Sequence, residues 1–120
     1  MAKLSAHGDE LFRYFSVSRR RLLSLRSDGQ CMAMSGLDRT WRNYAKKKPE
    51  VSVDAWVAGH RRREAEQPVW ARDIRSIPSQ RQLEEWVHDC CCETPGGDSV
   101  EPDGYGQGGA PSWLLLLGLL

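Results

Sequence analysis

The chain has 120 residues, of which 40% are hydrophobic and 28% are charged, a composition that excludes an intrinsically disordered protein and suits one folded domain. The formal net charge of +1 hides two halves of opposite sign. Residues 1–63 carry 14 Lys and Arg against 6 Asp and Glu, whereas residues 64–120 carry 3 against 10. The basic half is suited to nucleic acid or an acidic protein, unless the two halves neutralise each other within one fold.

The first elements in chain order predict a small antiparallel sheet. Residues 11–15 are rich in aromatic side chains, which strands favour, and residues 21–26 supply a second apolar strand. Asp28-Gly29 is a hairpin-turn signal that leads into a third strand at residues 31–35. Residues 41–47 fit either a short fourth strand or one helical turn.

Helices are expected after this sheet. Ser52 is a good N-cap for a helix over residues 53–66, in which apolar residues recur at the i, i+3, i+4, i+7 spacing of a buried face. Pro68 favours a second, shorter helix over residues 69–76, with Val69, Trp70 and Ile74 facing inward. Ser79 opens a capping box for a third helix that runs to about Cys91.

These elements predict an α+β fold in a single domain, residues 1–120, with a three- to four-stranded sheet packed against two or three helices. Residues 94–112 are rich in Gly and Pro and predict a loop or arm. The apolar segment 113–120 is shorter than the roughly 20 residues that cross a bilayer, so we expect it to dock on the core rather than enter a membrane. The expected core is Leu11, Leu23, Leu25, Met32, Trp56, Val57, Trp70, Ile74, Leu83, Trp86 and Val87.

The cysteines do not form a convincing catalytic or metal motif. Cys90, Cys91 and Cys92 are consecutive, and neighbouring side chains on a helix point about 100° apart, whereas a zinc site needs converging ligands. His88 could approach Cys91 or Cys92 on a helix, but no oxyanion motif accompanies them. We therefore expect no enzyme activity, no metal and no cofactor. Free thiols without an export signal favour a cytoplasmic protein.

The strongest candidates for binding are three basic clusters, at residues 19–21, 46–48 and 61–63. Aromatic residues at positions 14, 15, 41 and 44 lie among them and are suited to stacking on unpaired bases. The third cluster also has a structural explanation, because cations stabilise the C-terminal end of a helix. The residues expected to contact a protein partner or nucleic acid are Arg19, Arg20, Arg21, Trp41, Lys46, Lys47, Lys48, Arg61, Arg62 and Arg63.

Seven short segments carry a resemblance: 3–10 (KLSAHGDE), 27–29 (SDG), 40–41 (TW), 46–49 (KKKP), 93–95 (ETP), 100–104 (VEPDG) and 110–114 (APSWL). Together they resemble small accessory proteins of bacteriophages and prophages. The resemblance implies a bacterial cytoplasm and carries over no catalytic residue. We expect a non-enzymatic protein that binds a host or phage macromolecule, for example as an inhibitor of a host defence complex. The alternative is a nucleic-acid-binding protein that uses the basic half.

Overall fold

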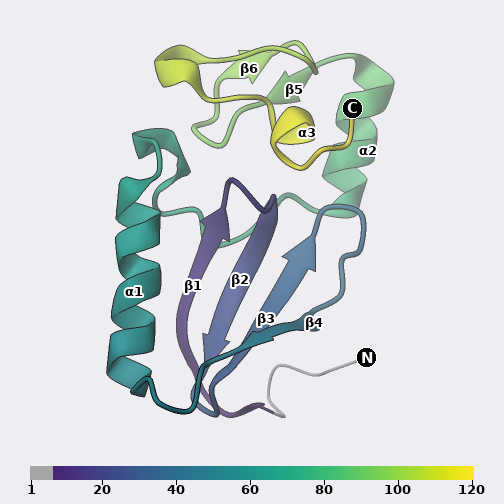
Figure 1. Ribbon diagram of the computed structural model, residues 1–120. Helices are drawn as coiled ribbons and strands as arrows, with labels where there is room; N and C mark the ends of the chain where they lie inside the picture. The colour runs from purple at the N-terminus through teal and green to yellow at the C-terminus, as the bar shows by residue number, and fades with distance from the viewer. Residues whose placement is uncertain (1–6) are drawn as a thin grey trace.

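The computed structural model describes residues 7–120, and these form a four-stranded antiparallel sheet, a helix beside it and a group of short elements at its end (Figure 1). The strands lie in the order of the sequence, so each pairs with the next. This arrangement confirms the predicted α+β class. The strands are β1 (Glu10–Ser16), β2 (Arg21–Arg26), β3 (Gln30–Ser35) and β4 (Arg42–Lys46).

The turn signals place the strand register. Leu25 pairs with Cys31 around the predicted Asp28-Gly29 turn, where Gly29 has a φ of 88° that favours glycine. The ambiguous segment forms β4, which pairs with β3 through an irregularity between Cys31 and Met32. All five residues of β4 are exposed. Its basic side chains protect this edge strand from pairing with another chain.

Helix α1 (Val53–Glu66) matches the predicted helix, and the Ser52 hydroxyl caps it by accepting a hydrogen bond from the Ala55 N–H at 3.1 Å. It packs against one face of the sheet, chiefly along β1. Trp56 and Val57 contact that face and are half-buried. The buried residues beneath them are Phe12, Tyr14, Leu23, Leu25, Cys31 and Ala33.

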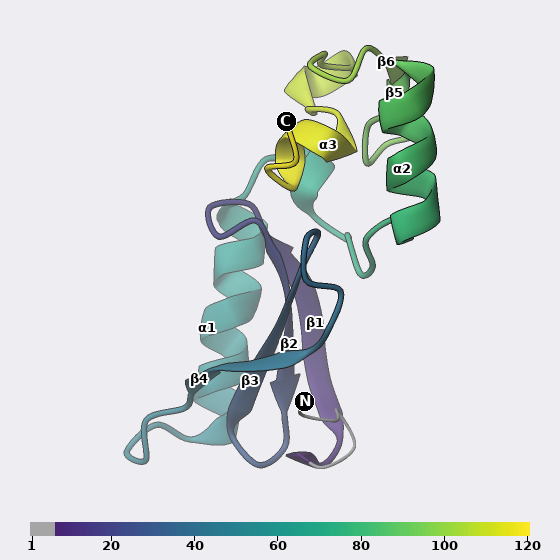
Figure 2. The ribbon, with the colours of Figure 1, turned by 90° about the vertical axis from the view of Figure 1, so that its right-hand side faces the viewer.

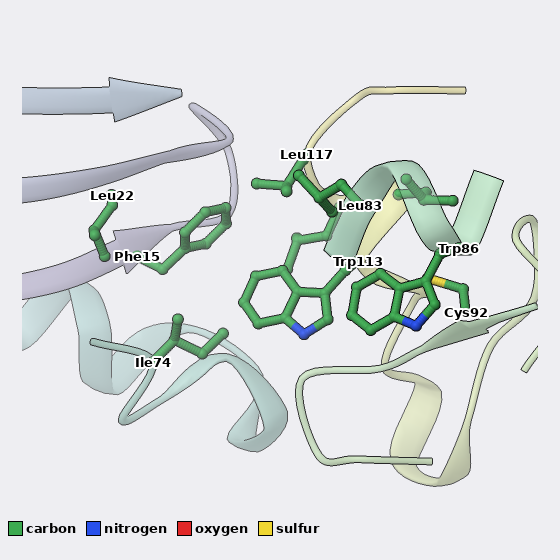
Figure 3. Close-up of a cluster of buried hydrophobic side chains, with 10 residues drawn as sticks. Phe15, Leu22, Ile74, Leu83, Trp86, Cys92, Trp113 and Leu117 are labelled. Carbon is green, nitrogen blue, oxygen red and sulfur yellow. The ribbon is translucent and has the colours of Figure 1, made fainter. Parts of the chain in front are cut away.

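The C-terminal elements gather beyond one end of the sheet rather than on its face (Figure 2). Together with the end of the sheet they enclose a second hydrophobic core, separate from the one between α1 and the sheet. In Figure 3, Trp113 lies between Phe15 of the sheet and Trp86, and its ring meets that of Phe15 edge-on at 6.2 Å between centroids. The elements are η2 (Val69–Ala71), α2 (Gln80–Asp89), β5 (Cys92–Glu93), β6 (Ser99–Val100), η3 (Gln107–Gly109) and α3 (Trp113–Leu116).

The helix predicted over residues 69–76 is wrong, because only the single 3₁₀ turn η2 forms there. Arg72 is extended and Asp73 has a φ of +67°, so the backbone leaves the helical region directly after η2. Ile74 does reach the core, but Val69 is 75% exposed. Trp70 is only half-buried against the second core.

Helix α2 buries a narrower face than expected. Ser79 caps it as predicted, with its hydroxyl accepting from the Gln82 N–H at 3.1 Å. Leu83 and Trp86 are buried, whereas Val87, placed in the predicted core, is 55% exposed. The reason is that α2 has packing partners on one side only. Leu11, also placed in the core, is only half-buried because it lines an open hollow beside α1.

The segment 94–112 contains short ordered elements. Strand β6 pairs with β5, and Tyr105 forms a bridge with Pro111. Beyond it, α3 places Trp113, Leu114 and Leu116 in the second core. None of the helices within residues 7–120 is long and apolar enough to cross a membrane.

Candidate functional site: a basic groove between α1 and β4

Two adjoining hollows lie on the side of the sheet that α1 covers, and both have Arg19 and Arg63 in their walls. The first, of about 540 Å³, lies at the turn between β1 and β2. The second, of about 260 Å³, lies between α1 and β4, with buried Leu23 and Cys31 as its floor. We call the two together the basic groove, after its five cations: Arg19, Lys46, Lys47, Lys48 and Arg63.

The β1–β2 turn holds Arg19 in position, and α1 holds the turn. Gln67, directly after α1, accepts a hydrogen bond from the Val17 N–H at 2.8 Å and donates one to the Phe15 carbonyl at 2.9 Å. Arg63 belongs to the last turn of the same helix. The two guanidinium groups therefore come from segments that Gln67 ties together.

The lysines enter the groove from the opposite wall, where β4 ends. The backbone N–H of Lys47 donates to the Gly29 carbonyl at 2.8 Å, which extends the pairing of β4 to the hairpin turn. Its ammonium group donates to the Val51 carbonyl at 2.7 Å and fixes the connection into α1. Lys47 is thus partly structural, while Lys46 and Lys48 keep their charges available to a ligand.

The cations of the groove have no acidic side chain within ion-pair distance among the described residues. Among residues 7–120, none of the five groove cations takes part in an ion pair. No Asp or Glu is among the described residues that line either hollow. Cations gathered without counter-charges create a local positive potential that attracts anions. The chemistry of the groove is therefore suited to an anionic ligand.

The inner wall of the groove is aromatic and neutral. The hydroxyl of Tyr14 and Nδ1 of His60 share a hydrogen bond of 2.7 Å, and the ring of Trp56 meets the His60 ring edge-on. Burial, with the nearby guanidinium groups of Arg63 and Arg19, lowers the pKa of His60 to about 4. Burial also raises the pKa of the Tyr14 hydroxyl. Both side chains are uncharged at neutral pH.

Cys31 forms part of the floor but is not an activated nucleophile. Burial raises the pKa of its thiol to about 11, so the reactive thiolate is scarce at neutral pH. The sulfur donates weakly to the Met32 carbonyl at 3.8 Å. The chemistry that this arrangement supports is anion binding.

The structure divides the residues predicted to contact a partner. Arg21 lies over the ring of Tyr44, outside the lining of both hollows. Arg20 lies against Gly118. Arg61 belongs to α1 and lies over the Phe12 ring. Arg62 lines neither hollow. Trp41 packs against the second core, with Arg13 over its ring at 5.1 Å.

The aromatic residues expected to stack on bases are not available for stacking. Tyr14 is 2% exposed, and Phe15 is fully buried in the second core. Tyr44 is more exposed, but Arg19 and Arg21 lie over its ring and Arg19 donates to its hydroxyl at 2.7 Å. The sheet is therefore not a platform of exposed rings.

Two residues of the groove escaped sequence reasoning. His60 falls at the i+7 position, counted from Val53, of the spacing predicted for the buried face of α1, and this position carries no indication of a role. Gln67 carried no signal, because its two partners in the β1–β2 turn are about 50 residues away in sequence.

The consecutive cysteines do not converge. Cys92 is buried, while Cys90 and Cys91 are exposed, with Cys91 Sγ 3.4 Å from the Ser99 hydroxyl. Within residues 7–120 no group of three or more His, Cys, Asp or Glu side chains is placed to hold a metal ion.

No family model, curated protein or solved structure matches the chain. Its function is therefore inferred from the chemistry of the groove.

Proposed function

We propose that the protein is a non-enzymatic binding protein of a bacteriophage or prophage, acting in the bacterial cytoplasm. Its basic groove binds an acidic segment of a host or phage protein, for example a component of a host defence complex whose activity it blocks. The phage setting rests on the short sequence segments that resemble accessory proteins of that origin.

The observation that carries the proposal is a groove with five cations that form no ion pair and with no carboxylate among the described residues that line it. Complementary charge of this kind accelerates association and selects acidic partners. Arg19 and Arg63 offer planar forks suited to carboxylate groups, while Lys46 and Lys48 add mobile point charges.

A protein partner is favoured over single-stranded nucleic acid. Sequence-tolerant binding of single strands combines a basic groove with aromatic rings on which bases stack. In this groove Tyr14 is buried, half-buried Trp56 packs against the sheet with its ring edge-on to His60, and two arginines lie over Tyr44. Nucleic acid bound through its phosphates alone is the alternative that the cations keep open.

The test is an affinity capture from bacterial lysate, with and without nuclease, using the full chain and two variants. The first variant, Lys46→Glu with Arg63→Glu, reverses charge at both walls of the groove. The second, Arg62→Glu, reverses a neighbouring charge on α1 that lines neither hollow. Captured proteins are identified by mass spectrometry.

The proposal expects a protein that survives nuclease, is lost with the groove variant and is retained by Arg62→Glu. Its binding to the purified chain should weaken as salt rises, because the contacts are electrostatic. Capture that nuclease abolishes would favour the nucleic-acid alternative. A partner that both variants retain would contradict the role of the groove.

A further inference from the structure

The hollow at the β1–β2 turn carries a different set of donors from the rest of the groove. Arg19 lines it from the turn, where one of its N–H groups donates to the Tyr44 hydroxyl at 2.7 Å, and Arg63 lines it from the last turn of α1. Ser16 and Ser18 bring two hydroxyl groups to the same wall. Guanidinium and hydroxyl groups therefore surround one space from two directions.

Ser16 has no close hydrogen-bond partner for its hydroxyl. The residue is only 6% exposed, and among the described residues its hydroxyl contacts only Ser18 Oγ, at 3.5 Å. That distance is well beyond the roughly 2.7–2.8 Å of a good O–H···O bond. Because buried polar groups are normally paired, this hydroxyl is available to a ligand in the hollow.

These donors match a phosphate group better than a carboxylate. One guanidinium fork satisfies the two oxygens of a planar carboxylate. A phosphate monoester is tetrahedral, has three terminal oxygens and carries about −1.5 to −2 charge near neutral pH, so it can use two forks and neighbouring hydroxyls together. The hollow, at about 540 Å³, also has room for the group that carries the phosphate.

We propose that this hollow binds one phosphate monoester, presented by a phosphorylated Ser or Thr side chain of the partner protein. The protein source of the phosphate rests on the proposed function. It is favoured over a nucleotide because, among residues 7–120, the one ring in the lining is that of Tyr14, which is buried and hydrogen-bonded to His60 and so offers no face on which a base could stack.

The test follows backbone amide NMR shifts of the full chain during titration with N-acetyl-phosphoserine methylamide. We expect saturable shifts at residues 16–19 and at Arg63. Arg63→Gln should weaken binding about tenfold or more, because it removes a charge-assisted pair of hydrogen bonds. Arg63→Lys keeps the charge but lacks the guanidinium fork, so its affinity should lie between that of the unchanged chain and that of Arg63→Gln. Arg62→Gln, at a position on α1 that lines neither hollow, should bind as the unchanged chain does.

Three matched probes decide the class and source of the ligand. Equal binding of the corresponding glutamate compound would overturn the preference for phosphate. Equal binding of inorganic phosphate would overturn a side-chain source, as would tighter binding of a short 5′-phosphorylated oligonucleotide. Absence of saturable shifts would also reject the inference. The proposed function stands or falls separately, because charge reversal and lysate capture do not require a phosphorylated partner.

Discussion

The hydroxyl of Tyr14 and Nδ1 of His60 lie 2.7 Å apart and join β1 to α1 between residues 46 positions apart in sequence. The pair stands at the inner wall of the basic groove, with the guanidinium groups of Arg63 and Arg19 close enough to depress the pKa of His60. Burial is the largest cause of this lowered pKa, and the two cations of the groove add to it, so the histidine is neutral at neutral pH.

The first prediction concerns acid stability. The pKa of His60 is about 4 in the folded protein against an ordinary 6.5, so the unfolded chain takes up the proton first as pH falls. The contribution of His60 is fully present above about pH 6.5 and is lost progressively down to about pH 4. After allowance for solvent screening around a half-buried ring, we expect a loss of about 1–2 kcal/mol across this range.

Denaturant unfolding at a series of pH values measures this loss. His60→Gln should flatten the fall in the free energy of unfolding between pH 6.5 and 4, while His88→Gln, at an exposed position on α2, should not. Identical pH profiles for the unchanged chain and His60→Gln would contradict the prediction.

The second prediction concerns the tie between α1 and the β1–β2 turn. Gln67→Ala removes both hydrogen bonds to the turn and leaves the Val17 N–H and the Phe15 carbonyl without these partners. We expect a loss of about 1–3 kcal/mol in the free energy of unfolding, together with weaker partner binding because Arg19 is no longer held. Glu66→Ala, at an exposed neighbouring position, should change either quantity little. Equal effects of the two substitutions would show that the tie is unimportant.

The third prediction concerns the second core. Leu114 is completely buried in α3, so Leu114→Ala should leave a cavity and reduce the free energy of unfolding by about 2–5 kcal/mol. Leu120 is 63% exposed, and Leu120→Ala should cost far less. Chemical denaturation of the two variants measures the difference. Similar values would mean that the second core does not depend on α3.

The fourth prediction concerns the end of α2. Cys90 ends the helix with a φ of 54°, in the left-handed region that glycine tolerates best. Cys90→Gly should therefore raise the free energy of unfolding by about 0.5–1 kcal/mol. Cys91→Gly lies one residue further and outside the left-handed residues, so it should not stabilise. Thermal unfolding of both variants is a direct comparison, and stabilisation by Cys91→Gly alone would refute the explanation.

Local signals predicted the elements that depend on local physics. Ser52, with the apolar spacing that follows it, predicted α1, and Asp28-Gly29 predicted the hairpin between β2 and β3. The helix expected after Pro68 does not form, because the chain extends there and brings Ile74 into the second core. Local helix propensity cannot predict this long-range packing.

The sequence predicted only some of the residues that form the groove. Arg61, Arg62 and Arg63 form one cluster on paper, but successive residues on a helix point about 100° apart, so only Arg63 turns toward the groove. Arg61 instead lies over Phe12. Arg63 and Arg19 line the same hollows because of the way α1 packs against β1. No spacing within the sequence predicts that packing.

The position of Trp113 between the sheet and α2 bears on how the chain folds during synthesis. A ribosome completes the sheet and α1 well before it reaches α3, so the sheet can close against α1 while Phe15 and Leu22 still lack their later partners. This end of the nascent sheet remains an apolar surface until α3 emerges. Chaperone capture, or premature pairing between neighbouring nascent chains, should therefore concentrate there rather than at the basic groove.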